Sequence, residues 1–170
     1  MNVTGIIIDD FLDKPDLVRN SALQLEFNAT GQFPGFRSDR ADENYERYIK
    51  EKFEKILNLK IKEFVQDSFR FQICSDNVDS WVHSDETDWA GILYLTPNPP
   101  VEAGTGIYRK VGEEWELVSA FGNLYNRLVL YPGRLYHRSI MSGFGHSKET
   151  GRLTQTFFFN IEHEYNTFYR

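Results

Sequence analysis

Two histidines and an aspartate have the types and order of a metal-binding set. His83 and Asp85 stand two positions apart, so in an extended strand their side chains leave the same face. This pair alone is a weak signal, because four histidines among 170 residues make a chance match common. His137 adds a third ligand further along the chain. Two imidazoles and one carboxylate on one face of an octahedral ion are typical of non-haem iron(II) and leave three positions open.

A competing third ligand is His146. It falls in a predicted glycine-containing loop at 142–150, whereas His137 lies in an apolar strand after the tight turn at Pro132 and Gly133. We therefore expect His137 to be the ligand. A single histidine in a strand is more often a hydrogen-bonded core residue, so the prediction depends on the whole set.

Arg152 opens the last predicted strand, 152–161, after both histidines. A guanidinium can hold a carboxylate with two parallel hydrogen bonds, which suits the far carboxylate of a 2-oxo acid bound to the metal. Thr154 shares a strand face with Arg152 and is expected to serve the same carboxylate. The chemistry indicated is the use of dioxygen at iron with a 2-oxo acid as cosubstrate.

With their neighbours, these residues resemble the 2-oxoglutarate- and iron(II)-dependent oxygenases, in particular the prolyl-hydroxylase-like branch. The resemblance covers about residues 68–160 and rests on Trp-Val-His-Ser-Asp at 81–85, Ile-Leu-Tyr-Leu-Thr at 92–96, Asn-Arg-Leu-Val-Leu-Tyr-Pro at 126–132, His137, and Arg152 with Thr154. It implies that His83, Asp85 and His137 are the catalytic metal ligands and that Fe(II), 2-oxoglutarate and O2 are the cofactors. It also implies that Tyr94 supports the distal carboxylate of 2-oxoglutarate.

The implied reaction is a hydroxylation that converts 2-oxoglutarate to succinate and oxidises an amino-acid residue or a small polar molecule. A carboxylate at Asp85 makes halogenation less expected, since the halogenases of this family lack a carboxylate there. Two alternatives stay open. One is a non-catalytic jelly-roll module that binds a sugar or peptide, and the other is a cupin-like metal enzyme that uses no 2-oxo acid. Substrate, desaturation as an outcome, and oligomeric state also stay open.

Short apolar runs separated by turn residues predict the sheets that must position this set. Strands are expected at 3–12, 69–75, 80–85, 89–96, 105–110, 124–131, 135–141 and 152–161. Helices are expected at 15–27 and 43–57, where apolar residues recur at helical spacing. The predicted fold class is mainly β with flanking helices (α+β), a double-stranded β-helix or jelly roll packed against N-terminal helices.

A single domain is expected over 1–170, with 1–66 as helical support and 67–161 as the jelly-roll core. Glycines and a proline predict a loop at 28–39. Phe33, Phe36 and Arg37 in this loop are candidates for substrate contact at the mouth of the barrel. Packing of the loop into the core would explain them equally well.

The composition argues against several classes of protein. A net charge of −6 opposes a nucleic-acid surface, which needs clustered lysine and arginine. No apolar run approaches the roughly 20 residues of a membrane-spanning helix. Cys74 is the single cysteine, and the first residues lack the pattern of a signal peptide, so a reducing, cytoplasmic location is expected. The expected partner is a small-molecule or peptide substrate.

Overall fold

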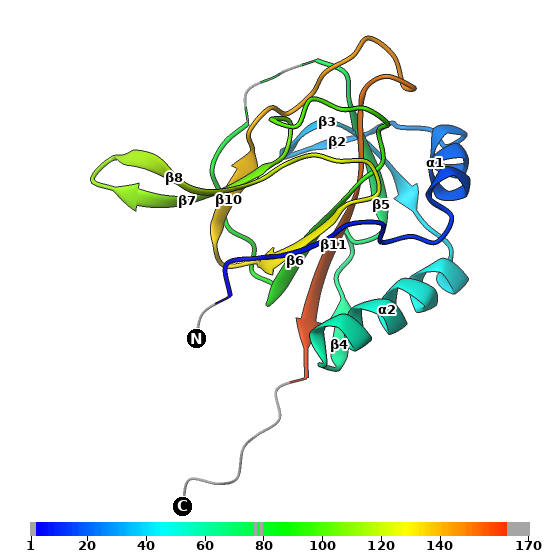
Figure 1. The fold of residues 1–170 in the computed structure, drawn as a ribbon, viewed down its shortest axis with the longest axis horizontal. Helices are drawn as coiled ribbons and strands as arrows, with labels where there is room; N and C mark the ends of the chain where they lie inside the picture. Colours follow the sequence, from blue (N-terminus) through cyan, green and yellow to red (C-terminus); the bar gives the residue numbers. More distant parts are fainter. Residues whose placement is uncertain (1–2, 77, 79, 163–170) are drawn as a thin grey trace, which may run out of the picture.

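Strands dominate the computed structural model, which describes residues 3–76, 78 and 80–162 (Figure 1). The helices are α1 (Pro15–Leu23) and α2 (Glu43–Leu57). The strands are β1 (Ile6–Ile8), β2 (Ala29–Gly31), β3 (Phe33–Arg40), β4 (Ile61–Phe64), β5 (Arg70–Cys74), β6 (Trp89–Tyr94), β7 (Thr105–Val111), β8 (Glu114–Phe121), β9 (Leu128–Pro132), β10 (Tyr136–Ser139) and β11 (Arg152–Ile161).

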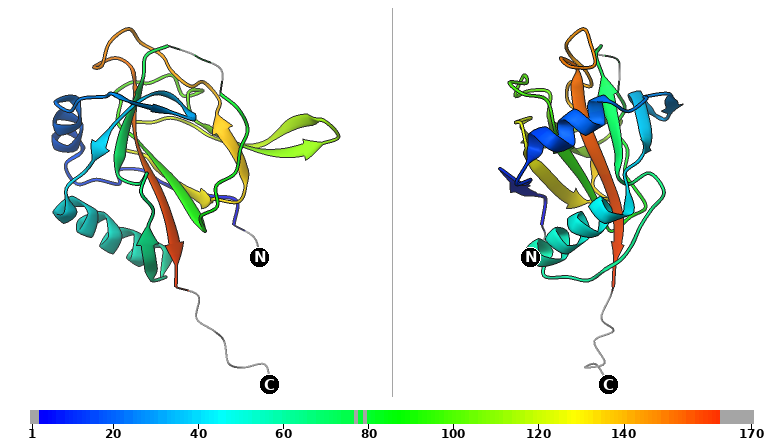
Figure 2. Two further views of the ribbon diagram at one scale, coloured as in Figure 1. Left: turned by 180° about the vertical axis from the view of Figure 1, so that it is seen from behind. Right: turned by 90° about the vertical axis from the view of Figure 1, so that its right-hand side faces the viewer.

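The strands form two antiparallel sheets. The larger sheet has the order β1-β9-β6-β11-β5-β3-β2, with β4 also paired to β11. The smaller sheet has the order β10-β7-β8, and its β7–β8 hairpin extends away from the rest of the protein, as the left view of Figure 2 shows. From β6 onward the chain passes between the two sheets, since β6, β9 and β11 belong to the larger sheet and β7, β8 and β10 to the smaller one, as the predicted jelly roll requires.

Alternation along the central strands separates two cores. On β11, Leu153, Phe157 and Phe159 join a buried cluster with α1 and α2, which lie on the same side of the molecule (Figure 1). On β6, Tyr94 joins a second cluster, in which the larger sheet meets Ile107 of the smaller sheet. Because successive side chains of a strand point to opposite faces, the larger sheet is a middle layer between the helices and the smaller sheet.

Local signals explain where α2 begins and ends. The Asp42 side chain accepts hydrogen bonds from the backbone N–H groups of Asn44 (3.0 Å) and Tyr45 (3.1 Å), which caps the first turn. The helix stops at Asn58, which has a left-handed φ of 51°. Both ends agree with the predicted 43–57. The first helix begins at Pro15 as expected but ends at Leu23, four residues short of the predicted 27.

The prediction of a loop at 28–39 is wrong, because β2 and β3 occupy this segment. Gly35 does not break the strand: it has a φ of +76°, and a Cβ there would lie 2.1 Å from the carbonyl oxygen of Ile73 on the neighbouring β5. Glycine therefore permits close approach of two strands here. The segment 1–66, expected to be helical support, supplies β1 to β4 as well as both helices.

Two further differences concern the strands. The predicted strand at 80–85 is absent except for one isolated bridge at His83. The strands β4 and β8 were not expected. β8 carries mostly exposed residues on both faces, so it lacks the alternation of apolar and polar side chains on which strand prediction depends. In the part of the chain described here, neither helix combines the length and apolar character needed to cross a membrane.

The helix-facing core depends on the ring of Phe53, which lies 5.0 Å from the ring of Phe157 and 5.5 Å from that of Phe159, centroid to centroid. We expect Phe53→Ala to lower the free energy of unfolding by about 3–5 kcal/mol, because it leaves a cavity in a fully buried site. Ile56→Ala on the exposed face of the same helix should cost under about 1 kcal/mol. Urea denaturation measures both, and equal losses would contradict this assignment of the core.

Candidate metal centre

His83 and His137 are held side by side by two backbone hydrogen bonds. The N–H of His83 donates to the carbonyl of His137 (3.1 Å), and the N–H of His137 donates to the carbonyl of His83 (2.8 Å). Residues paired in this way across antiparallel chains project their side chains to the same face. The two imidazole centroids are accordingly 4.5 Å apart. This bridge replaces the predicted strand at 80–85 and leaves the two histidines on one face.

Asp85 joins the histidines through a second backbone contact. Its N–H donates to the carbonyl of Gly133 (2.8 Å), in the turn that leads to β10. One carboxylate oxygen, Oδ2, lies 3.4 Å from Nε2 of His137 and is buried without a hydrogen-bond partner. One ligand atom from each of His83, Asp85 and His137 lies within 4.8 Å of the others. An unpartnered buried carboxylate oxygen beside two imidazoles fits a bound cation.

Both imidazoles are oriented by backbone carbonyl groups. Nδ1 of His83 lies 3.1 Å from the carbonyl oxygen of Trp81, and Nδ1 of His137 lies 2.8 Å from that of Leu135. Because a carbonyl only accepts hydrogen bonds, Nδ1 carries the proton in each ring and Nε2 keeps its lone pair. Burial lowers the pKa of His137 to about 4. His137 is thus neutral at pH 7, as a metal ligand must be.

A narrow cavity of about 80 Å³ adjoins the histidines and is bounded by Arg152 and Thr154. Arg152 is 2% exposed, and its Nε donates to the carbonyl of Ala103 (3.0 Å). Its Nη2 and the hydroxyl of Thr154 are buried without hydrogen-bond partners. No ion pair with a carboxylate links Arg152 to the other residues described by the structure. A buried, unpaired cation is costly, so this end of the cavity suits an anionic ligand.

Tyr94 lies behind the cavity wall. Its hydroxyl forms a 2.8 Å hydrogen bond with the hydroxyl of Thr105, which does line the cavity. The guanidinium carbon of Arg152 lies 5.5 Å from the centroid of the Tyr94 ring. Tyr94 is completely buried, and this burial raises the pKa of its phenol. The residue therefore contacts the anion-binding end through Thr105 and its ring face.

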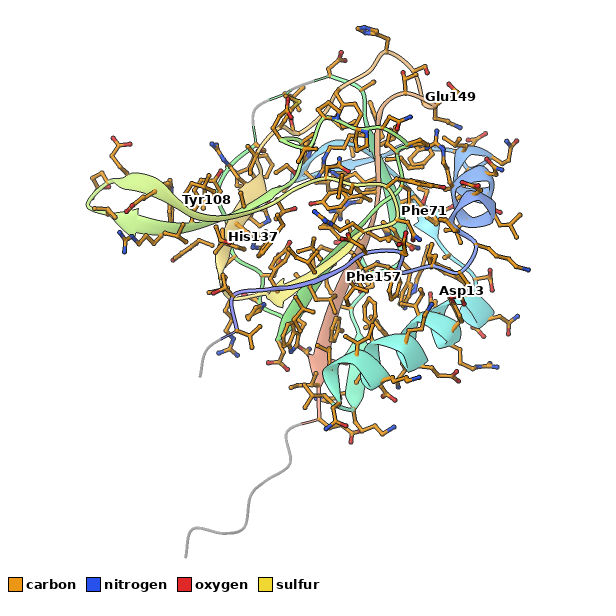
Figure 3. All side chains as sticks on the ribbon, in the orientation of Figure 1. Asp13, Phe71, Tyr108, His137, Glu149 and Phe157 are labelled. Carbon is orange, nitrogen blue, oxygen red and sulfur yellow. The ribbon has the colours of Figure 1, made fainter. Side chains whose placement is uncertain are left out.

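A wider cleft of about 770 Å³ opens beside the narrow cavity. It is lined by Asp67, Arg70, Asp85 and Glu86, among others. The residues that line both spaces are Gln32, Phe33, Arg37, Trp81, His83 and Phe158. The candidate metal ligands thus lie where a small inner space meets a larger outer one. In Figure 3, His137 lies on the β10 side of the molecule, away from the helices.

The structure brings together His83, Asp85 and His137, and it places Arg152 and Thr154 beside them. Of the three substrate-contact candidates, Phe33 and Arg37 line both spaces. Phe36 lines neither space and is 49% exposed.

The reason lies in the register of β3. Phe33 and Arg37 are an even number of positions apart and share the inward face, whereas Phe36 lies on the opposite face of the strand. Sequence reasoning also missed Thr105 and Tyr131, which line the inner cavity from β7 and β9. The polar Thr105 within an otherwise apolar inward face is a signal that could have identified one of them.

The comparisons with known proteins find similarity at the level of the fold. No protein-family model matches the sequence, and no curated protein does. Solved structures do match. A prolyl hydroxylase from Trichoplax adhaerens, in complex with a hypoxia inducible factor oxygen degradation domain peptide fragment, is 12% identical with a TM-score of 0.64, over 92% of this chain and 83% of that chain. A prolyl-4-hydroxylase from Pseudomonas putida is 17% identical with a TM-score of 0.61, over 94% and 93%.

A third structure is HygX from Streptomyces hygroscopicus, with nickel and 2-oxoglutarate bound. It is 12% identical with a TM-score of 0.59, over 94% of this chain and 83% of that chain. At these identities the similarity concerns the fold. The predicted double-stranded β-helix is confirmed.

The three ligands predict binding of one divalent cation. We expect metal-free protein to bind Mn²⁺ or Co²⁺ with one-to-one stoichiometry in isothermal titration, and His137→Ala or Asp85→Ala to weaken binding at least about tenfold. His146→Ala is the matched control, since this histidine lies in the 142–150 loop, outside the candidate set. Equal affinity in all three variants would contradict the assignment.

The pKa of His137 also predicts a pH dependence of stability. In the unfolded chain this imidazole has a pKa of about 6.5, whereas in the folded protein it is about 4, so the unfolded state binds more protons between these values. Acidification of the metal-free protein from about pH 7.5 to about pH 5 should therefore lower the contribution of His137 to stability by about 2 kcal/mol. Urea denaturation of wild type and His137→Gln measures the difference, which should shrink at low pH. A stability difference that does not change with pH would contradict a lowered pKa of His137 in the folded protein.

Proposed function

We propose that this protein is a 2-oxoglutarate- and iron(II)-dependent oxygenase. The single observation that carries the proposal is the position of Arg152, a buried arginine with an unpartnered Nη2 that lines the same narrow cavity as His83 and His137, with Asp85 beside these histidines at the adjoining outer cleft. Metal sites are common on many folds, whereas a metal set facing a buried anion-binding arginine suits a chelating dicarboxylic acid. The shared fold with two prolyl hydroxylases supports the same class.

His83, Asp85 and His137 would hold the iron. The two Nε2 atoms donate lone pairs, and the carboxylate of Asp85 compensates part of the positive charge. When bound, iron(II) and 2-oxoglutarate supply the oxidation of a carbon–hydrogen bond by dioxygen, with release of carbon dioxide and succinate. The carbonyl groups of Trp81 and Leu135 keep both imidazoles in the tautomer that this role needs.

Arg152 and Thr154 would bind the distal carboxylate of 2-oxoglutarate. The guanidinium offers Nη2, and Thr154 offers its hydroxyl, and both are free of other hydrogen bonds. Water is largely excluded here, so these charge-assisted hydrogen bonds are strong. Tyr94 would support them from behind, since its ring faces the guanidinium and its hydroxyl is bonded to Thr105.

The outer cleft would receive the substrate, and its position beside the iron ligands suits hydroxylation of a small polar molecule or an amino-acid residue. Its walls include aromatic side chains, Phe33 and Trp81, and the charged side chains Arg37 and Asp67. A cleft of this size holds a small molecule or the side chain of a peptide. The Trichoplax adhaerens neighbour holds a peptide fragment, which keeps a peptide among the substrates to be tested.

The deciding experiment is anaerobic addition of iron(II) and 2-oxoglutarate to the metal-free protein. We expect a weak visible charge-transfer band, lost in His83→Ala and in Asp85→Ala, because a chelated 2-oxo acid needs the complete ligand set. An unchanged spectrum in the wild type would count heavily against the proposal. A cupin-like enzyme without a 2-oxo acid would bind iron yet give no such band.

A second prediction isolates Arg152. We expect Arg152→Gln to weaken binding of 2-oxoglutarate about 100-fold, because it removes a charge-assisted contact in a buried site. Affinity for the metal should change less than about twofold, since Arg152 is not a ligand. Arg109→Gln, on the exposed hairpin, is the control and should leave both affinities unchanged. Retention of 2-oxoglutarate affinity in Arg152→Gln would refute the assigned role.

A further inference from the structure

Arg37 is a second buried arginine of the site, on β3 at the junction of the two spaces. It is 8% exposed and lines both the inner cavity and the outer cleft. Burial lowers its pKa to about 10, which leaves the guanidinium charged at neutral pH. A positive charge thus faces the space beside the proposed iron ligands, in a protein whose net charge is −6.

The guanidinium is fixed in place before any ligand binds. Its Nε donates to Oε1 of Gln72 (2.9 Å), and Nε2 of Gln72 donates in turn to the carbonyl of Pro34 (2.8 Å). The guanidinium carbon lies 3.9 Å from the centroid of the Phe33 ring. Because the guanidinium is already held along one edge and on one face, the side chain loses little conformational entropy when the remaining edge binds a ligand.

The terminal nitrogens of Arg37 have little to bind in the described structure. Its single ion pair there is with Asp67, at 4.0 Å, and the Asp67 side chain is 63% exposed. Such a long pair with a solvated carboxylate contributes little. By comparison, Arg40 on the same strand is already paired, since its guanidinium donates two hydrogen bonds to the carboxylate of Glu46. Arg37 therefore keeps its bidentate donor edge for a ligand.

We propose that Arg37 binds a carboxylate of the substrate, so that the enzyme acts on a molecule with a free carboxylate group. This inference rests on the proposed function, which assigns the inner arginine, Arg152, to the cosubstrate. The two buried arginines would then bind different carboxylic acids: Arg152 would bind 2-oxoglutarate, and Arg37 would bind the substrate. The aromatic ring of Phe33 beside the guanidinium would cover the apolar part of the substrate.

Binding of N-acetylated amino acids tests the proposal without iron or turnover. Each compound is offered to the full, metal-free chain both as the free acid and as the amide, and affinity is measured by ligand-observed NMR. We expect acids to bind wild type at least about tenfold more tightly than their amides, because the guanidinium gains a bidentate, charge-assisted contact. Tight binding of the amides of aspartate and glutamate would place the recognised carboxylate on a side chain of a peptide substrate.

Variants then locate the contact. Arg37→Gln should reduce the affinity for the acids to that for the amides, and Arg37→Lys should retain an intermediate preference, since it keeps the charge but loses the fork. Arg40→Gln, a neighbouring arginine already paired with Glu46, should match wild type. Thermal unfolding of each variant checks that it is folded, and the comparison of acids with amides in the wild type does not depend on any variant.

The proposal is overturned if compounds with a free carboxylate, including the amides of aspartate and glutamate, bind no better than compounds without one, or if Arg37→Gln keeps the preference for a carboxylate. The role of Arg37 and the proposed function can be refuted independently of each other. Binding of 2-oxoglutarate with iron, together with no acid preference, would refute only the role of Arg37. An acid preference lost in Arg37→Gln, together with no binding of 2-oxoglutarate, would refute only the oxygenase.

Discussion

The pair of backbone hydrogen bonds between His83 and His137 is the contact on which the site depends. His83 belongs to no strand, so these bonds alone fix its distance from His137 across the sheet edge. The turn before β10 adds a third bond, from Asp85 to Gly133. A Cβ at Gly133 would lie 2.4 Å from the carbonyl oxygen of Thr87, so glycine is what lets the two segments approach closely enough. Three backbone contacts thus position three side chains.

The layered fold explains how so polar a site can be buried. On β11, Arg152, Thr154 and Thr156 line the inner cavity, while Leu153, Phe157 and Phe159 on the other face pack beneath the helices. The one polar side chain on that other face, Gln155, is buried with a hydrogen bond from the hydroxyl of Tyr45 on α2. The aromatic cluster around Phe53 stabilises the other face of the same strand, and it thereby offsets the cost of holding Arg152 away from water.

Sequence reasoning succeeded where local physics decides the outcome. The bounds of α2 follow from a capping aspartate and a helical apolar stripe, and β11 follows from a long run of β-branched and aromatic residues. It failed where tertiary contacts decide. Gly35 signals a turn in isolation, and its close approach to Ile73 becomes visible only when β5 is in place. Among the predicted contact residues, Phe33 lines the site and Phe36 does not, and this choice depends on the face that β3 presents, which cannot be assigned to a segment predicted as a loop.

The missing anionic partner of Arg152 has a consequence for the charge balance of the closed site. In the proposed complex, a divalent cation bound to Asp85 would keep one surplus positive charge beside that of Arg152, while the charge of Arg37 lies at the junction with the outer cleft. A dicarboxylate would compensate the charges of the metal and Arg152 together, which leaves the charge of Arg37 for the substrate. Monoanions would leave a surplus charge in a medium of low dielectric constant, where it is costly. In the proposed enzyme, the site would thus select its cosubstrate by total charge as well as by shape.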